Sequence, residues 1–227
     1  LFKKNFAKFF SQSIKNKKSF FVITGMGQKL FQEKRFPDIK TMMCKYVFKL
    51  GNLRQNSFFI FQNKDDFNIF KNYKIINNEN YKVICGNGID ETRFQLKTTH
   101  QPIKMPIFLF CGRIEKAKGI IELLHAIEEL LLEEYPFEFI FAGKLDNEDR
   151  FILNYFERLV SNNDNLSYKG IIQHSDIHEI YSEANILVLP SHGEGLPATG
   201  VEGLSMGMPL ILSNAGGCKE LIKNDEN

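Results

Sequence analysis

Residues 107–223 show the sequence feature that most constrains the fold. Short apolar runs alternate there with longer segments whose apolar residues recur with helical period. We expect five strands, at "IFLFC" (107–111), "FEFIFA" (137–142), "NLSYK" (165–169), "ILVLP" (186–190) and "PLILS" (209–213). Helical segments are expected near 118–134, 148–160, 176–183, 197–206 and 217–223. This alternation predicts an open, doubly wound α/β unit with a parallel sheet, which binds ligands at the carboxyl ends of its strands.

The first part of the chain predicts a second, less regular unit of the same class. Strands are expected at "SFFVIT" (19–24), "SFFIF" (57–61) and "YKVIC" (81–85), with helices near 40–50 and 64–71. Asn63 is a candidate cap of the second helix, with Asp65 and Asp66 in its first turn. The polar, proline-containing stretch at 97–106 is read as a hinge. We therefore predict two domains, 1–104 and 105–227.

Charge differs strongly between the two parts. Residues 1–110 hold 20 Lys and Arg against 7 Asp and Glu, a net charge of +13, whereas residues 111–227 hold 9 against 20, a net charge of −11. Such polarity favours an anionic partner for the first part, such as a membrane surface or a phosphate-bearing substrate. The chain has no nucleic-acid-binding motif and no regular platform of aromatic and basic residues, so we expect no nucleic-acid partner.

The opening segment, "LFKKNFAKFFSQSIKNKK", places its apolar side chains on one helical face and six lysines on the rest. Two interpretations stay open. The first is an ordinary helix that packs on the core with a solvated lysine face, and the second is a helix that lies at a membrane interface. No apolar run reaches the roughly 18 residues that a spanning helix needs, so we expect a cytoplasmic protein, with peripheral contact at the inner membrane face under the second interpretation.

Cysteine spacing gives no sign of a disulfide framework or a zinc site. The four cysteines stand at 44, 85, 111 and 218, which fits a reducing compartment. His174 and His178 are spaced as a metal pair on a helix face, but no third ligand accompanies them, so no metal site is expected.

The stretch that follows the strand at 107–111 has the residues of a phosphate site. Gly112 allows a tight turn, and Arg113 and Lys118 flank a loop that leads into a helix. Cations near a helix N-terminus act together with its amide dipoles on a phosphate group. Surface cations near helix starts are common, however, and the pattern alone also fits a plain solvated loop.

The stretch that follows the strand at 186–190 carries two glutamates, Glu194 and Glu202, in the sequence "SHGEGLPATGVEG". Gly193 and Gly195 would allow a ligand to approach the backbone, and Pro197 suits the first turn of a helix. Carboxylates there can accept hydrogen bonds from vicinal hydroxyl groups, as acidic residues of dinucleotide sites do from ribose. Alternatively, both are surface acids, although Glu202 stands among apolar residues, where burial without a partner would be costly.

These segments together resemble the retaining GT-B glycosyltransferases of sequence family 4. The matches are "NGID" (87–90), "GRIEKAKG" (112–119), "EGLPATGVE" (194–202), "GMPLILSNAGG" (207–217) and Glu220. "ITGMG" (23–27) and "FQNKDDF" (61–67) resemble members that build bacterial capsule or O-antigen repeats on a lipid carrier. The resemblance implies two Rossmann-like domains and transfer of a sugar, with retention of configuration, from a nucleoside-diphosphate sugar to a lipid-linked or saccharide acceptor.

The resemblance also implies a role for each site residue. Arg113 and Lys118 would bind the donor diphosphate and stabilise the leaving group, Glu194 would bind hydroxyls of the transferred sugar, and Glu202 would bind the ribose. Donor binding would involve Gly112, Gly193, Gly195, Leu196 and Pro197 as well. The donor is expected to be a UDP-sugar, without a metal cofactor. Independently of the resemblance, Gly25, Gly27 and His192 are candidates for the acceptor side, although a plain tight turn explains the glycines as well and a loop histidine at a strand end is more often structural.

Two features of the match leave alternatives open. The family's first strand with its glycine-rich loop and its final crossing helix have no counterpart here, so we expect a piece of a longer protein with an incomplete N-terminal domain. A nucleotide-sugar-binding module without turnover is therefore the second hypothesis. A glycosidase that used two carboxylates would leave Arg113 and Lys118 without a role.

Overall fold

The structure, a computed structural model, describes residues 19–25, 46, 57–76, 79–86, 88–96 and 105–222. The lysine-rich opening segment, the predicted helix near 40–50 except Tyr46, and most of the predicted hinge lie outside these residues. Contacts divide the chain into two units, Leu1–Gly86 with Glu194–Leu196, and Asn87–Gly193 with Pro197–Asn227. The first unit ends at Gly86, before the predicted hinge, because Phe94 is already buried in a core of the second unit.

The first unit contains three parallel strands in the order β1-β2-β3. They are β1 (Ser19–Ile23), β2 (Ser57–Phe61) and β3 (Tyr81–Val83), and α4 (Lys64–Asn72) follows β2. These elements confirm the three strands and the helix predicted at 64–71. Asn63 caps α4 as expected, because its side chain accepts a hydrogen bond of 2.7 Å from the backbone N–H of Asp66. Aromatic rings from β2 and α4 form much of the core of this unit.

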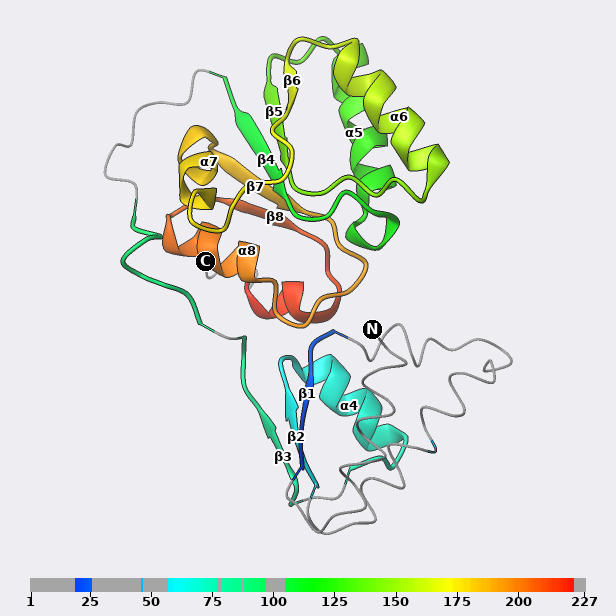
Figure 1. Cartoon of the computed structure of the whole chain (residues 1–227), viewed down its shortest axis with the longest axis vertical. Helices are drawn as coiled ribbons and strands as arrows, with labels where there is room; N and C mark the ends of the chain where they lie inside the picture. The colour runs from blue at the N-terminus through cyan, green and yellow to red at the C-terminus, as the bar shows by residue number, and fades with distance from the viewer. Residues whose placement is uncertain are drawn as a thin grey trace. The chain divides into compact units, whose positions relative to one another are not determined.

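The second unit is a five-stranded parallel sheet in the order β6-β5-β4-β7-β8 (Figure 1). All five predicted strands are confirmed within one or two residues: β4 (Ile107–Cys111), β5 (Glu138–Ala142), β6 (Leu166–Tyr168), β7 (Ile186–Leu189) and β8 (Leu210–Leu212). The α-helices are α5 (Ile120–Leu132), α6 (Arg150–Ser161), α7 (Ile177–Glu183) and α8 (Ala198–Ser205).

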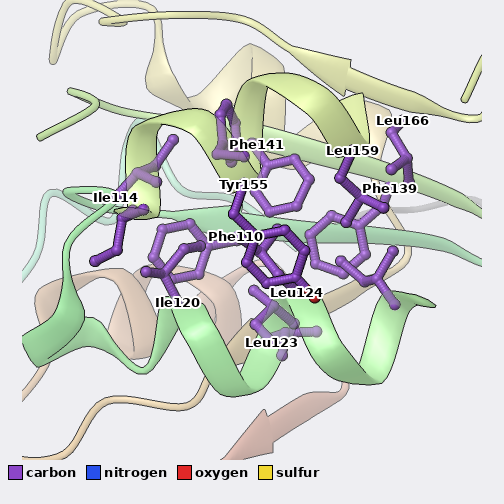
Figure 2. Close-up of a cluster of buried hydrophobic side chains, with 14 of the residues drawn as sticks. Phe110, Ile114, Ile120, Leu123, Leu124, Phe139, Phe141, Tyr155, Leu159 and Leu166 are labelled. Carbon is purple, nitrogen blue, oxygen red and sulfur yellow. The ribbon is translucent and has the colours of Figure 1, made fainter. Parts of the chain in front are cut away.

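Two hydrophobic cores bury the two faces of this sheet. Along β4, Phe108 and Phe110 contribute to the core under α5 and α6, whereas Leu109 and Cys111 contribute to the core that includes side chains of α7. Figure 2 shows how side chains of β4 and β5 meet those of α5 and α6 in the first core. Successive strand residues point to opposite faces, so burial of both faces requires the continuous apolar runs seen in the sequence.

Three details differ from the prediction. The helix expected over 118–134 is divided into a 3₁₀ turn, η1 (Lys116–Lys118), and α5, because Gly119 between them has a left-handed backbone with φ of 69°. The segment expected as a helix at 217–223 is a 3₁₀ turn, η2 (Gly216–Glu220). His174 lies in the turn before α7, so it does not share a helix face with His178 as predicted.

The sheet order reverses at β4, and this reversal positions the site. From β4 the chain adds β5 and β6 on one side, and later adds β7 and β8 on the other. The loops that follow β4 and β7 lead to α5 and α8, which belong to opposite layers of an open sheet, and a crevice forms where such loops separate. The two loops are nevertheless packed together at one point, where a Cβ atom on Gly119 would lie 2.0 Å from the carbonyl oxygen of Pro190.

This contact predicts that Gly119→Ala destabilises the second unit severely. The substitution combines a left-handed backbone, which costs about 1–2 kcal/mol for a residue other than glycine, with a clash against main chain that cannot rotate away. Gly170→Ala is the matched control, because Gly170 has φ of 70° and no atom within 4 Å of an added Cβ. Denaturant unfolding of the full chain should show a loss for Gly119→Ala at least about twice that for the control. Equal losses would contradict the tight packing of the two loops.

Candidate functional site

The loop after β4 is held by backbone hydrogen bonds to the loop after β5. Gly112 N–H donates to the carbonyl of Ala142 at 2.9 Å, and Ile114 N–H donates to that of Lys144 at 2.9 Å. A Cβ atom on Gly143 would lie 1.8 Å from the carbonyl oxygen of Gly112, so only glycine fits there. The backbone on either side of Arg113 is therefore held by hydrogen bonds to the backbone of the loop after β5.

The loop after β7 contacts the same region from the other side. His192 N–H donates to the carbonyl of Ala117 in η1 at 3.1 Å. The imidazole Nε2 of His192 lies 3.2 Å from a carboxylate oxygen of Glu122, in the first turn of α5. His192, a candidate for the acceptor side, thus contacts both η1 and α5, and in this structure it helps to join the loops that follow β4 and β7.

Both predicted cations belong to this loop junction, and Lys116, which is exposed on η1, is a third. Arg113 is 65% exposed, and its guanidinium lies 2.8 Å from the carboxylate of Glu115, which is 16% exposed. Lys118 is half-buried at the end of η1, next to Gly119. An exposed guanidinium that is paired with one neighbouring carboxylate still has N–H groups for a second anion, because guanidinium has five donors.

Glu202 is buried within the second unit and has the partner that its burial requires. The residue, on α8, is 6% exposed, and the hydroxyl of Tyr181 on α7 donates to its Oε2 at 2.9 Å. Tyr181 is fully buried. Cys111, at the carboxyl end of β4, is buried in the same hydrophobic cluster as this tyrosine. These contacts place Glu202 beside the strand end from which the Gly112 loop leaves.

The environment keeps the hydroxyl and thiol of this cluster protonated. Burial raises the pKa of Tyr181 well above its usual value, and the nearby Cys111 and Glu202 raise it further. Burial raises the pKa of the Cys111 thiol to about 11, and the charge of Glu202 adds to this effect. At neutral pH, Tyr181 is therefore a hydrogen-bond donor to the Glu202 carboxylate, and Cys111 is a neutral thiol rather than a reactive thiolate.

Glu194, Gly195 and Leu196 group with the first unit by their contacts. The side-chain N–H₂ of Asn63 donates to the carbonyls of Glu194 at 3.1 Å and Gly195 at 2.9 Å. Gly195 is buried, and a Cβ atom there would lie 2.4 Å from the side-chain oxygen of Gln62. The structure thus explains Gly195 by packing, while the convergence of the Glu194 side chain with Arg113 and Lys118 stays a prediction.

Gly25 is the described member of the predicted acceptor-side pair, and Gly27 lies outside the described residues. Gly25 has φ of 82°, and its N–H donates to the carboxylate of Asp66 at 3.0 Å. Asp66 is itself buried and accepts from Asn63 at 3.2 Å. The turn at Gly25 therefore needs glycine for its backbone conformation, and an acceptor role for it remains a prediction.

The described residues of the second unit line at least two cavities. One, of about 360 Å³, follows β8 and is lined by Leu212, Ser213, Asn214, Cys218, Lys219 and Ile222. It lies at the carboxyl end of the sheet, the edge where an open sheet binds ligands. The other, of about 470 Å³, lies between α5 and α6 and is lined by His125, Glu128, Phe151, Asn154, Tyr155 and Arg158. Its lining belongs to the helix layer and includes no residue that follows a strand.

Within the described part of the chain, no group of three or more His, Cys, Asp or Glu side chains is placed to hold a metal ion. The described residues also contain no helix long and apolar enough to cross a membrane.

Sequence reasoning predicted the loops that follow β4 and β7 but missed the partner of Glu202. The apolar neighbours of Glu202 indicated that a buried carboxylate would need a donor, and the structure supplies Tyr181, which is 21 positions earlier in the chain. No fixed spacing links the two, because they lie on different helices. Lys219 beside the cavity after β8 was also missed, although its position after a predicted strand is the kind of signal that could have indicated it.

The family profile and the curated relatives that match this chain agree on one family of proteins. The sequence profile of the family described as "Glycosyl transferases group 1" matches residues 91–227. Among curated relatives, a capsular polysaccharide biosynthesis glycosyltransferase, CapM of Staphylococcus aureus, is 27% identical over 147 residues, which are 62% of this chain and 38% of the relative. A putative teichuronic acid biosynthesis glycosyltransferase of Bacillus subtilis, TuaC, is 28% identical over 136 residues, 60% of this chain and 32% of the relative.

Solved structures share the fold at lower identity. HepE of Anabaena, solved in complex with UDP and glucose, matches with a TM-score of 0.74 and 18% identity over 96% of this chain and 58% of that one. Sucrose-phosphate synthase of Thermosynechococcus elongatus matches with a TM-score of 0.71 and 21% identity over 91% and 53%. These neighbours are GT-B glycosyltransferases, so the predicted α/β class of GT-B type is confirmed.

The chain spans about a third of the length of the curated relatives that it matches first. The family profile covers more than half of the chain, including the loops after β4 and β7, the Tyr181–Glu202 pair and the cavity after β8. The chain therefore belongs to the family of group 1 glycosyl transferases.

Proposed function

We propose that this chain carries the donor-binding part of a glycosyltransferase that transfers a sugar from a nucleoside-diphosphate sugar to a lipid-linked or saccharide acceptor with retention of configuration. The observation that carries the proposal is the junction of the loops after β4 and β7 at the reversal point of the sheet, with Arg113 and Lys118 on it. The named relatives in capsule and teichuronic acid synthesis support a role in surface polysaccharide synthesis.

In this proposal the cations act on the leaving group. Negative charge grows on the nucleoside diphosphate as the glycosidic bond breaks, so fixed cations beside it stabilise the transition state more than the ground state. Arg113 and Lys118 supply this charge, and the rigid backbone around Gly112 keeps Arg113 close to its working position. We assign no protein nucleophile, so Glu194 binds hydroxyls of the transferred sugar and does not form a covalent intermediate.

The donor is proposed to be a UDP-sugar, by analogy with HepE and with the pneumococcal O-GlcNAc transferase that was solved with UDP. Glu202 binds the ribose, and Gly193, Gly195, Leu196 and Pro197 shape the loop around the donor. No metal cofactor is part of the proposal, because the cations of the chain take the role that a divalent ion takes in other transferases. The lysine-rich opening segment would support peripheral contact with the inner membrane face.

Removal of the Arg113 guanidinium tests the leaving-group role. Arg113→Ala in the full chain should lower the release of nucleoside diphosphate from its preferred donor by about 100-fold or more, as loss of one preorganised donor of charge stabilisation does. Arg158→Ala is a matched control, because Arg158 is 64% exposed and also paired with a glutamate, Glu128, but it lies on α6. Equal turnover in the two variants would contradict the role. Donor binding without release in the wild type would favour the binding module without turnover.

Ligand-induced stabilisation tests donor choice and the absence of a metal. In a thermal-shift screen, the preferred nucleotide sugar at about 100 times its Kd should stabilise the folded chain by about 2.7 kcal/mol. A UDP-sugar should exceed the GDP- and ADP-sugars. Addition of EDTA should leave both the shift and the turnover unchanged. A shift or turnover that disappears with EDTA and returns with Mg²⁺ would contradict metal-independent donor binding.

A further inference from the structure

The buried carboxylate of Glu202 needs an anchor if it is to select between ligands. It lies on α8, a helix of eight residues whose first turn follows the loop at Gly193–Pro197. A carboxylate on a short helix binds ribose hydroxyls selectively only when its side-chain rotamer is already fixed. If the rotamer has to be ordered on binding, the entropy lost reduces the free energy gained from each hydrogen bond.

Tyr181 supplies such an anchor. Its hydroxyl donates to Oε2 of Glu202 at 2.9 Å, and it lies 3.3 Å from the carbonyl of Thr199 on the same helix. A hydroxyl has one proton, so the shorter contact, to the charged group, is the stronger one. The ring of Tyr181 is fully buried and packs edge-on against Phe94, with ring centroids 6.0 Å apart. The hydroxyl therefore has little freedom to leave Glu202.

The same tyrosine connects Glu202 to the strand that leads into the phosphate loop. Cys111, the last residue of β4, is buried in the same hydrophobic cluster as Tyr181, and Gly112 and Arg113 follow it directly. All three members of the cluster are buried, at 8% exposure or less. The positions of the carboxylate and of the loop with Arg113 are thus related through side chains of β4, α7 and α8.

We propose that Tyr181 is a positioning residue for donor recognition, which fixes one oxygen of the Glu202 carboxylate so that the other accepts hydrogen bonds from the ribose of the donor. The inference rests on the proposed function, because it takes Glu202 as the ribose-binding residue. It goes beyond it by assigning the preference for ribose over deoxyribose to the Tyr181–Glu202 pair, with Cys111 as the contact between that pair and β4.

The test is the ribose preference of nucleotide binding in the full chain. The probe is whichever of UDP, GDP and ADP the wild type binds best, together with its 2′-deoxy and 3′-deoxy forms, measured by calorimetry. The wild type should prefer the ribo form by about tenfold, the value of a hydrogen bond to a charged group. Tyr181→Phe should bind the ribo form about tenfold more weakly and the deoxy forms nearly as well as the wild type does, so that the preference disappears.

Tyr155→Phe is the matched control for lost stability. Tyr155 is also a buried tyrosine whose hydroxyl donates to a glutamate, Glu128, but this pair lies between α5 and α6. The control should keep the wild-type ribose preference even if its melting temperature falls as far as that of Tyr181→Phe. A purely structural role of Tyr181 would lower the melting temperature without changing the preference.

A double variant keeps the test decisive if Tyr181→Phe folds poorly. Tyr181→Phe with Glu202→Gln removes the buried charge together with its partner, which relieves the cost of an unpaired carboxylate. If Tyr181 acts through Glu202, the double variant should lose no more ribose preference than Glu202→Gln alone. Additive losses, or a full ribose preference in Tyr181→Phe, would overturn the inference while the proposed function stands. A wild type that binds no nucleoside diphosphate would overturn the proposed function itself.

Discussion

Burial of both faces of the five-stranded sheet is the constraint on which the second unit depends. Each central strand must present apolar side chains on both sides, and β4 does so with Phe108 and Phe110 on one face and Leu109 and Cys111 on the other. Helices must then cover both faces. The chain therefore adds strands on one side of β4 first and on the other side later, and all of the strands stay parallel. The reversal at β4 separates the loops after β4 and β7, and most of the residues proposed to bind the donor lie on these loops.

Cys111 shows how closely the core and the site are connected. It is buried in the core, it is the last residue of β4, and it belongs to the same hydrophobic cluster as Tyr181, whose pKa it helps to raise. The next two residues, Gly112 and Arg113, already belong to the loop. The core therefore ends within one residue of the loop that is proposed to bind the donor, so a small shift of the core at Cys111 would also move Arg113.

Much of this arrangement could be predicted from the sequence, because its signals are local. The strand "IFLFC" and the cap at Asn63 follow from residue types within a few positions of each other, and both are present. The break between η1 and α5 was missed, because it depends on Gly119 adopting a left-handed backbone against Pro190, a contact across more than 70 positions. The Tyr181–Glu202 pair was missed for the same reason. Local sequence patterns predict helices, strands and candidate site residues. Contacts between residues of distant elements can be identified only once the fold is known.

The glycine contacts at 119 and 143 have a consequence for redesign of the proposed donor site. A side chain at Gly119 would clash with the main chain of Pro190, and one at Gly143 would clash with that of Gly112, so neither glycine can be replaced without moving the loop that it contacts. Redesign of specificity would have to use side chains that point away from these contacts, for example around the cavity lined by Ser213, Asn214 and Lys219. The scaffold thus limits which mutations a directed-evolution library can usefully sample.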